Sequence, residues 1–323
     1  MRRLREFRQK DRPSAPTVVE NKPVEMHEYS GWKRKLHDFY FTEYKKLLII
    51  PFFILLLALA QIGYQVATTG DFIIKGVSLQ GGVTISFSTD KDVNLVKLQE
   101  ELINEQGSGD IIVRKFGQSG VIIEAGLPED KIDSFLRLVE SKTGIDQSTY
   151  SIEIMGSALG KSFFRQAFIA VIIAFLLMGL VVLVIFRTAV PSLAIMLAAF
   201  ADIVIPIAIL NLFGVKIQTA GIAAFLMLIG YSVDTDILLT IRVLKRKEGS
   251  VNERIISSMK TGMTMTLTAI ASTVTVLIFS TSQVLSQIML ILFIGLTADL
   301  LFTWIMNVGI LKMYIDSKEN AHD

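Results

Sequence analysis

The segment "IGYSVDTDILLTIRVLKRK", Ile229–Lys247, combines an apolar helix pattern with acidic and basic residues. It directly follows the residues "GIAAFLML" (221–228), which are apolar enough for the interior of a lipid bilayer. Two acids, Asp234 and Asp236, come next, and a run of basic residues ends the stretch. A carboxylate inside the hydrocarbon layer is energetically unfavourable and usually marks a functional position. The stretch therefore predicts a membrane-spanning helix that carries a functional acid.

The composition of the whole chain agrees with a membrane protein. Of the 323 residues 51% are hydrophobic, and the mean hydropathy is +0.53, above the usual value for soluble domains. The chain has no cysteine, which excludes disulfides, thiol nucleophiles and thiolate metal sites. Its three histidines, at positions 27, 37 and 322, lie in polar sequence near the termini, so no histidine-based metal or catalytic centre is expected. A net charge of +2 does not point to a nucleic-acid partner, and none is expected.

Six apolar runs are each long enough to cross the roughly 30 Å of a bilayer's hydrocarbon core as a helix. They lie at about 47–67, 167–186, 190–213, 217–241, 261–281 and 288–311. The first run follows a long charged segment, so it is expected to stay in the membrane as an anchor. We therefore expect a multi-pass protein of the cell membrane with six transmembrane helices.

Basic residues predict the orientation of these helices. Twelve Lys or Arg precede the first run, and six lie between the fourth and fifth runs. The turn between the third and fourth runs holds only Lys216, and "TSQVLSQ" (281–287) has no charge. The positive-inside rule then places both termini in the cytoplasm, with an N-terminal arm at 1–46 and a tail at 312–323.

The segment between the first two runs, 68–166, has the pattern of a small α/β domain. "GGVTISFS" (81–88) alternates like a strand, and "VNLVKLQEELINEQ" (93–106) has helical spacing. Two strands, a helix and a last strand follow as "DIIVRKF" (110–116), "GVIIEAG" (120–126), "PEDKIDSFLRLVES" (128–141) and "STYSIEIMG" (148–156). The order βαββαβ predicts an α+β ferredoxin-like domain on the extracytoplasmic side, followed by the other five helices at 167–311.

Four acids fall inside the predicted spans: Asp202, Asp234, Asp236 and Asp299. At about 1.5 Å of rise per residue, Asp202 and Asp299 lie near the middle of their helices. Asp234 and Asp236 point about 200° apart, so one of them is expected to face the bundle and the other a second helix, a water-filled crevice or a partner. Because the spans contain no Lys or Arg, we predict that the acids form a proton or cation path. The alternative for a single acid is a structural carboxyl group bonded to a neighbouring Ser or Thr.

Hydroxyl side chains accompany these acids. The fifth run carries a stripe with spacings of three and four: Thr261, Thr264, Thr268, Ser272 and Thr275. Thr264 and Thr268, together with Ser232 and Thr235 of the fourth run, are expected to support the ion path by pairing with carboxyl groups or bridging water. The alternative for any single hydroxyl is ordinary packing of small residues between helices.

Three stretches resemble the SecF branch of the SecD–SecF protein-export family, in the resistance-nodulation-division superfamily. "GVSLQGGVTISF" (76–87), with Gly81 and Gly82, resembles the family's Gly-Gly signature at the first strand of the exposed domain. "SIEIMGSALGKSFFRQA" (151–167) resembles the lead into the second helix. "GYSVDTDILLTIRVLKRK" (230–247), which begins at Gly230, resembles the fourth-helix motif. The resemblance covers about 45–312 and rests on order and topology together.

The fourth-helix motif departs from the bacterial pattern. Bacterial members read Gly-Tyr-Ser-x-Asn-Asp-Thr, with a proton-linked Asp where this chain has Thr235 between two acids. Arg242 matches the family's basic residue after the motif. The Arg that bacterial members carry near the start of the fifth helix is replaced by Thr264, or by Lys260 at its edge. The resemblance therefore implies an acidic fourth helix without a specific Asp–Arg relay, and "DTD" resembles the archaeal branch.

The resemblance implies an accessory subunit of the Sec export machinery. Its partners would be a SecD-like polytopic protein, the Sec translocon and secreted polypeptide chains, and the proton gradient would drive its assistance to translocation. Related transporters hold two six-helix halves in one chain, whereas this chain is one half, so a partner is expected to supply the other. The alternatives are a small-molecule or lipid efflux transporter subunit of the same superfamily and a purely structural subunit.

Neither enzymatic activity nor a cofactor is expected. The sequence offers no nucleophile–base set, metal-ligand constellation or Walker loop. "GSALGKS" (156–162) ends like a phosphate-binding loop, but Gly156 and Gly160 bracket three residues where that loop has four. We therefore do not expect nucleotide binding there.

Overall fold

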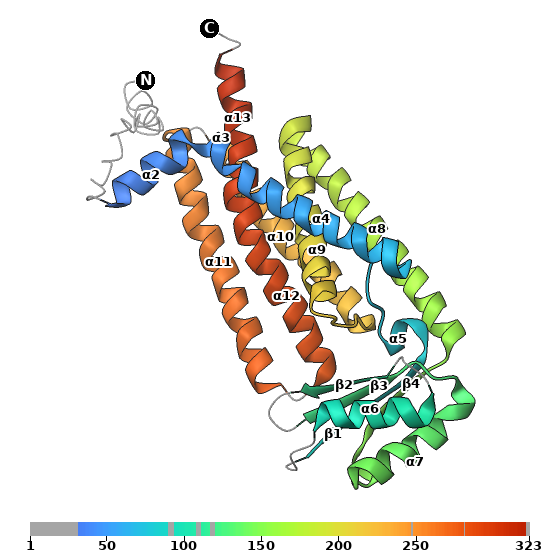
Figure 1. The fold of residues 1–323 in the computed structure, drawn as a ribbon. Helices are drawn as coiled ribbons and strands as arrows, with labels where there is room; N and C mark the ends of the chain where they lie inside the picture. Colours follow the sequence, from blue (N-terminus) through green and yellow to red (C-terminus); the bar gives the residue numbers. More distant parts are fainter. Residues whose placement is uncertain are drawn as a thin grey trace, which may run out of the picture.

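The computed structural model describes residues 32–89, 94–107, 111–116, 120–246, 248–280 and 282–320. Figure 1 shows two parts, a long helical bundle and a small sheet with two helices packed on it. Among these residues, six helical segments are long and apolar enough to cross a membrane: Tyr44–Thr69, Ser157–Phe186, Ala189–Leu212, Thr219–Lys245, Val251–Phe279 and Gln283–Glu319. The predicted six-span, multi-pass architecture is therefore confirmed. Most of the predicted N-terminal arm, residues 1–31, lies outside the described residues.

The helices of the bundle follow one another with short connections from α8 onward, whereas the small sheet domain separates α4 from α8. They are α4 (Ile49–Thr69), α8 (Ser157–Phe186), α9 (Ala189–Leu212), α10 (Thr219–Lys245), α11 (Val251–Phe279) and α12 (Gln283–Leu301), preceded by α2 (Trp32–Thr42) and α3 (Tyr44–Leu47). The last span continues from α12 through a π-helical segment, Phe302–Asn307, into α13 (Val308–Glu319). Burial is highest along α9 and α10, whereas α8 and α11 expose most of their surface, so α9 and α10 form the centre of the bundle.

Two spans begin about ten residues earlier than their apolar runs. The helix α8 starts at Ser157, directly after the last strand, and α11 starts at Val251. The start of α11 is fixed by a capping box, in which the Ser250 hydroxyl accepts from the Glu253 N–H at 3.3 Å and the Glu253 carboxylate accepts from the Ser250 N–H at 2.8 Å. Hydropathy locates only the apolar part of a helix, which explains why polar first turns were not included in the predicted spans.

The small antiparallel sheet lies between α4 and α8 in the chain, and its strands have the order β2-β3-β1-β4. The elements are β1 (Gly82–Ser88), α6 (Leu95–Gln106), β2 (Ile111–Phe116), β3 (Gly120–Ala125), α7 (Ile132–Thr143) and β4 (Ser151–Met155). Alternate residues of β1, including Val83 and Ile85, pack with Leu102 of α6 and Phe135 of α7 in one apolar core. Both helices therefore cover the same face of the sheet, as Figure 1 shows.

Two glycines allow the sharp connection from the short helix α5 (Val77–Gln80) into β1. Gly81 and Gly82 have φ angles of 99° and 129°, a region that residues with a Cβ rarely adopt. A Cβ on Gly82 would lie 2.3 Å from the carbonyl oxygen of Ala125. Gly160, in the first turn of α8, packs against the Gly81 backbone, so "GSALGKS" forms the packed start of a helix.

The other face of the sheet meets the bundle through polar side chains. Gln218, at the start of α10, accepts from the Ser78 hydroxyl at 2.6 Å and donates to Glu124 of β3 at 3.1 Å. Arg114 of β2 forms a salt bridge with the same Glu124 oxygen at 2.9 Å. The side chain of Gln287 in α12 accepts from the Gln218 N–H at 3.1 Å. We call these five residues the sheet–bundle joint.

Candidate functional site in the helical bundle

Three of the four predicted acids meet inside the bundle. Asp202 of α9, Asp236 of α10 and Asp299 of α12 are 1%, 0% and 1% exposed. Asp299 interacts electrostatically with each of the other two. In the part of the chain that the structure describes, none of the three forms a salt bridge with a Lys or Arg. We call these three residues the carboxylate cluster.

Neutral side chains hold two of the acids in place. The Ser232 hydroxyl donates to Oδ2 of Asp202, which links α10 to α9. The Asn307 amide donates to Oδ1 of Asp236 at 2.7 Å, which links the end of the π-helical segment to α10. Hydrogen bonds of this kind position a buried carboxyl group without neutralising its charge.

The hydroxyl of Thr303 bridges two of the acids. Its oxygen lies 2.8 Å from Oδ1 of Asp236 and 3.0 Å from Oδ1 of Asp299. A hydroxyl has one hydrogen to donate, whereas its lone pairs accept. Two ionised carboxylates would leave one of the two contacts without a hydrogen. If one carboxyl group is protonated, it donates to the Thr303 oxygen and both bonds are complete, so the geometry suits a proton held between Asp236 and Asp299.

Several oxygens of this region are buried without a hydrogen-bond partner among the described residues. They are Oδ1 of Asp202, Oδ2 of Asp236, Oδ2 of Asp299, Oδ1 of Asn307 and Oγ1 of Thr240. An unsatisfied buried polar atom is unfavourable by about 1–3 kcal/mol, so such a group favours any proton, water or small cation that reaches it.

The last span changes its winding beside the cluster. The segment Phe302–Asn307 is π-helical and carries both Thr303 and Asn307. Such segments are rare in proteins, and many of those that are known lie at functional sites. Sequence reasoning found Asp299 but missed Thr303 and Asn307. The signal was present, because polar residues recur at intervals of four from Asp299 within an otherwise apolar run.

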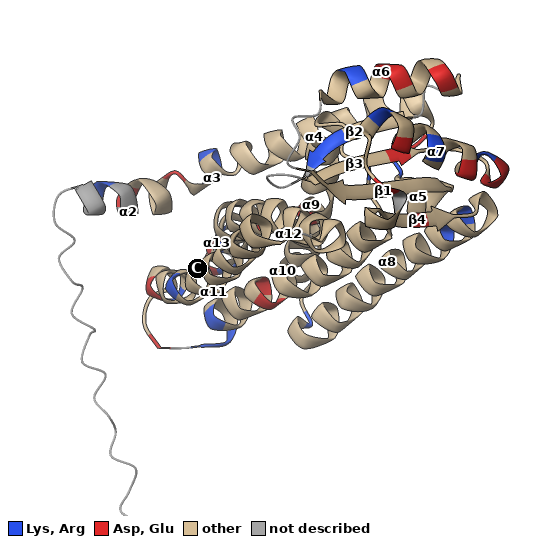
Figure 2. Ribbon diagram, turned by 90° about the horizontal axis from the view of Figure 1, so that it is seen from below, with Lys and Arg blue, Asp and Glu red and all other residues tan. Residues whose placement is uncertain are grey.

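The two acids of "DTD" have different surroundings. Asp236 faces the bundle interior, whereas Asp234 is exposed on the outer face of α10. Figure 2 shows this acidic turn of α10 among the mostly uncharged spans. Thr235, between the two acids, is buried against α11, where a Cβ on Gly262 would lie 3.1 Å from its methyl group. The side chains of Asp234 and Thr235 therefore point away from the cluster.

Of the other predicted supporting residues, Ser232 contacts the cluster, whereas Arg242, Thr264 and Thr268 lie away from it. Arg242 donates to the Ser257 carbonyl at 2.8 Å and to the Thr261 hydroxyl at 2.9 Å, so it ties α10 to α11. Thr264 and Thr268 are exposed on the outside of α11, and their hydroxyls bond to carbonyl oxygens of their own helix at 2.8 and 2.7 Å. The hydroxyl side chains of α11 thus share one face of the helix, as predicted, but this face points out of the bundle.

Comparison with known proteins identifies the family. The family model described as "Protein export membrane protein SecD/SecF, C-terminal" matches residues 136–317. The protein-export membrane protein SecF of Methanothermobacter thermautotrophicus is 40% identical over 286 residues, which is 87% of this chain and 96% of that protein. The chain belongs to the SecF family. SecF of Pyrococcus furiosus is a second relative, 38% identical over 291 residues, with 89% and 96% covered.

A solved structure shares the fold of this SecF family member. It is the crystal structure of SecDF, a translocon-associated membrane protein from Thermus, with a TM-score of 0.70 and 20% sequence identity. The match covers 86% of this chain but only 38% of the SecDF chain. The chain therefore spans nearly the full length of its SecF relatives and well under half of SecDF.

Proposed function

We propose that this chain is an accessory subunit of the Sec protein-export machinery that acts with a SecD-like membrane protein. Its relatives are named for protein export. The fold corresponds to 38% of a SecDF chain, so we propose that a second subunit supplies the part that corresponds to the rest of SecDF. The translocon and secreted polypeptides are then its further partners.

In this proposal the chain lies in the cell membrane with both termini in the cytoplasm, as the distribution of basic residues favours. The segment 68–166 is an extracytoplasmic domain, and the strand order β2-β3-β1-β4 within βαββαβ supports a ferredoxin-like fold for it. Residues 1–46 and 312–323 are the cytoplasmic arm and tail around the first span at 47–67 and the later spans at 167–311.

The carboxylate cluster couples a proton gradient to this assistance. The observation that carries the proposal is the Thr303 hydroxyl, which bridges two buried acids and has one hydrogen to share. Gain or loss of a proton changes the bonds between α10 and the last span. Asp236 lies 18 residues from Gln218 along the same helix, roughly 27 Å at 1.5 Å per residue. Movement of α10 is thereby passed to the sheet–bundle joint and the extracytoplasmic domain.

Export of secreted proteins in cells carrying Asp236→Asn tests this role. The amide keeps the size of the side chain but cannot exchange a proton, so maturation of secreted proteins should slow at least tenfold while the protein remains in the membrane. Asp133→Asn is the matched control, because it makes the same change at an exposed acid of α7, outside the cluster and the sheet–bundle joint. Export at the normal rate in the Asp236 variant would remove the proton-coupled role, and it is the outcome that an efflux function predicts.

The outer face of α10 is the proposed contact with the SecD-like partner. A Cβ on Gly230 would meet no atom within 4 Å, so packing within this chain does not account for the missing side chain. Small residues in membrane helices let a neighbouring helix approach closely. One turn further along, the exposed Asp234 needs a hydrogen-bond donor or cation at membrane depth.

Co-purification of the partner with Gly230→Leu tests this contact. A leucine on the contact face should separate the helices and reduce recovery of the SecD-like protein by about tenfold or more. Gly63→Leu is the matched control, because Gly63 is also an exposed helical glycine with no atom within 4 Å of an added Cβ. Equal recovery with the two variants would contradict the assignment of this face.

A further inference from the structure

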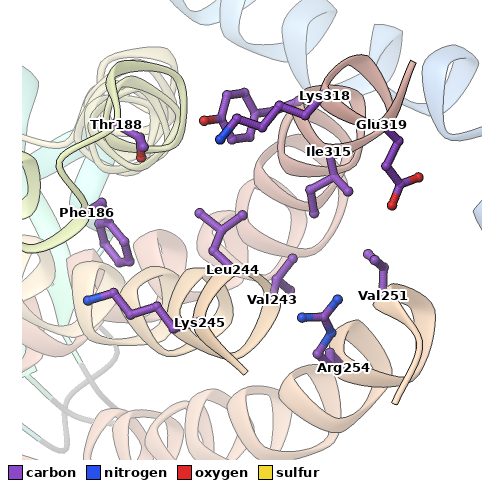
Figure 3. A pocket seen from close by; sticks show the side chains of 11 residues that line it. Phe186, Thr188, Val243, Leu244, Lys245, Val251, Arg254, Ile315, Lys318 and Glu319 are labelled. Atoms are coloured by element: carbon purple, nitrogen blue, oxygen red, sulfur yellow. The ribbon is translucent and has the colours of Figure 1, made fainter. Parts of the chain in front are cut away.

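A cavity of about 730 Å³ lies at the end of the bundle farthest from the sheet. Its walls come from α8, α10, α11 and α13, as Figure 3 shows. Three membrane-spanning helices end or begin beside it, at Phe186, Lys245 and Val251. The cavity therefore lies at the level of the membrane surface, on the side that we propose to be cytoplasmic.

Three basic side chains from three helices surround the cavity: Lys245 of α10, Arg254 of α11 and Lys318 of α13. None of them forms a salt bridge within the described ranges of the chain. One carboxylate, that of Glu319, also lines the cavity. Positive charge therefore exceeds negative charge, and the cavity favours an anion.

Arg254 has a donor without an acceptor. One of its terminal nitrogens donates to the Arg246 carbonyl, whereas Nε is buried with no hydrogen-bond partner among the described residues. A guanidinium group presents its N–H donors in a planar fork that matches the oxygens of a phosphate. An anion with several oxygens would satisfy this donor, which has no acceptor in the described part of the chain.

The remaining lining of the cavity is apolar. Phe186, Val243, Leu244 and Ile315 contribute to it, and in Figure 3 the side chains of Val243, Leu244 and Ile315 lie among the three basic ones. The Lys245 ammonium lies 5.6 Å from the centroid of the Phe186 ring, so a cation and an apolar surface meet there. A ligand that fills this space has an anionic head and an apolar body.

We propose that this cavity binds the phosphate-bearing headgroup of an anionic membrane lipid. Basic pockets between membrane helices at the cytoplasmic surface are suited to such headgroups. The phosphate lies within reach of Lys245, Arg254 and Lys318, and the start of the acyl chains contacts Leu244 and Ile315. The lipid bridges the ends of α10, α11 and α13. Of these, α10 carries Asp236 of the carboxylate cluster, and α13 follows the π-helical segment with Thr303 and Asn307. Inorganic phosphate shares the headgroup chemistry but makes no use of the apolar wall.

Native mass spectrometry of the purified full chain with added phosphatidylglycerol tests the proposal. The triple variant Lys245→Gln, Arg254→Gln, Lys318→Gln should bind this lipid on the order of 100-fold more weakly, from about fivefold for each basic side chain near the surface. The matched control, Lys45→Gln, Lys46→Gln, Lys260→Gln, removes the same charge from residues that do not line the cavity and should bind normally.

Two further arms separate a lipid from a free ion. Phosphatidylcholine should bind at least tenfold more weakly than phosphatidylglycerol, and Leu244→Ala with Ile315→Ala should weaken the lipid without affecting any binding of inorganic phosphate. Equal loss of lipid in the two triple variants would assign binding to the general surface charge and overturn the proposal. Displacement of the lipid by millimolar inorganic phosphate, or equal binding of the zwitterionic lipid, would also overturn it.

Discussion

Two buried polar regions of this chain differ in whether their acids are paired with a cation. In the sheet–bundle joint, Glu124 is 1% exposed and has a cation, Arg114, at 2.9 Å and the Gln218 amide at 3.1 Å. In the carboxylate cluster, three acids of similar burial have hydrogen bonds to neutral side chains and, among the described residues, no salt bridge. A buried charge that is paired within the protein is fixed, whereas one without a cation needs a proton or an ion from outside. In the proposed function, this difference separates an acid that stabilises the structure from acids that respond to a proton gradient.

The largest stability effect is expected when the joint is made to resemble the cluster. Arg114→Leu removes the cation and leaves Glu124 buried with an amide donor alone. Because Arg114 itself is partly exposed, we expect a loss of about 1–3 kcal/mol, below the 3–5 kcal/mol of a fully buried pair. Unfolding of the purified chain by heat or denaturant measures this. The double variant Arg114→Leu, Glu124→Leu should recover much of the loss, and no recovery would mean that Arg114 acts through packing alone.

A smaller effect is expected when the shared hydroxyl of the cluster is removed. Thr303→Val keeps the shape of the side chain but leaves Asp236 and Asp299 without their common partner. Stability should change by about 1 kcal/mol, the net value of one hydrogen bond, while export slows about fivefold or more. Thr303→Ser restores the hydroxyl and should restore export. If valine and serine behave alike in the export assay, the hydroxyl has no part in coupling.

The smallest effect is expected at an exposed acid that serves as a reference for both regions. The Ser148 N–H donates to the Asp146 carboxylate at 2.8 Å, which holds the pKa of Asp146 below its usual value. Its contribution to stability is therefore complete above the unfolded pKa of about 4 and is lost as the pH falls through the lowered pKa. The protection of the Ser148 amide, measured as its hydrogen-exchange rate relative to an unstructured peptide at the same pH, should fall over that acidic window, and Asp146→Ala should already lack it at neutral pH. Protection that stays constant through the window in the unmodified chain would contradict the assignment.

The fold could be predicted from the sequence because the patterns that indicate its helices and strands are local. Apolar runs located six spans, and alternation in stretches such as "GGVTISFS" located strands of the sheet. Helix starts were less accessible, since the polar first turn of α11 depends on the capping contact between Ser250 and Glu253. Local pattern thus identifies which elements exist better than where they begin.

The site was only partly accessible, because its residues come together from three helices. Spacing alone established that Asp234 and Asp236 face opposite directions, but packing decided that Asp236 is the inward one. The hydroxyl stripe of α11 shows the same limit, since periodicity identifies a face without revealing what that face meets. Gln218 was missed because a single polar residue at a helix start has no periodic signal.

Infrared spectroscopy of the purified chain with its SecD-like partner tests the central claim most directly. The carbonyl stretch of a protonated carboxyl group is distinct from that of a carboxylate, so it reports whether the cluster holds a proton. We predict such a band at neutral pH that disappears in both Asp236→Asn and Asp299→Asn and is unchanged in Glu124→Gln. A spectrum without the band, or a band that survives both substitutions in the cluster, would contradict the proposal that these acids carry the coupled proton.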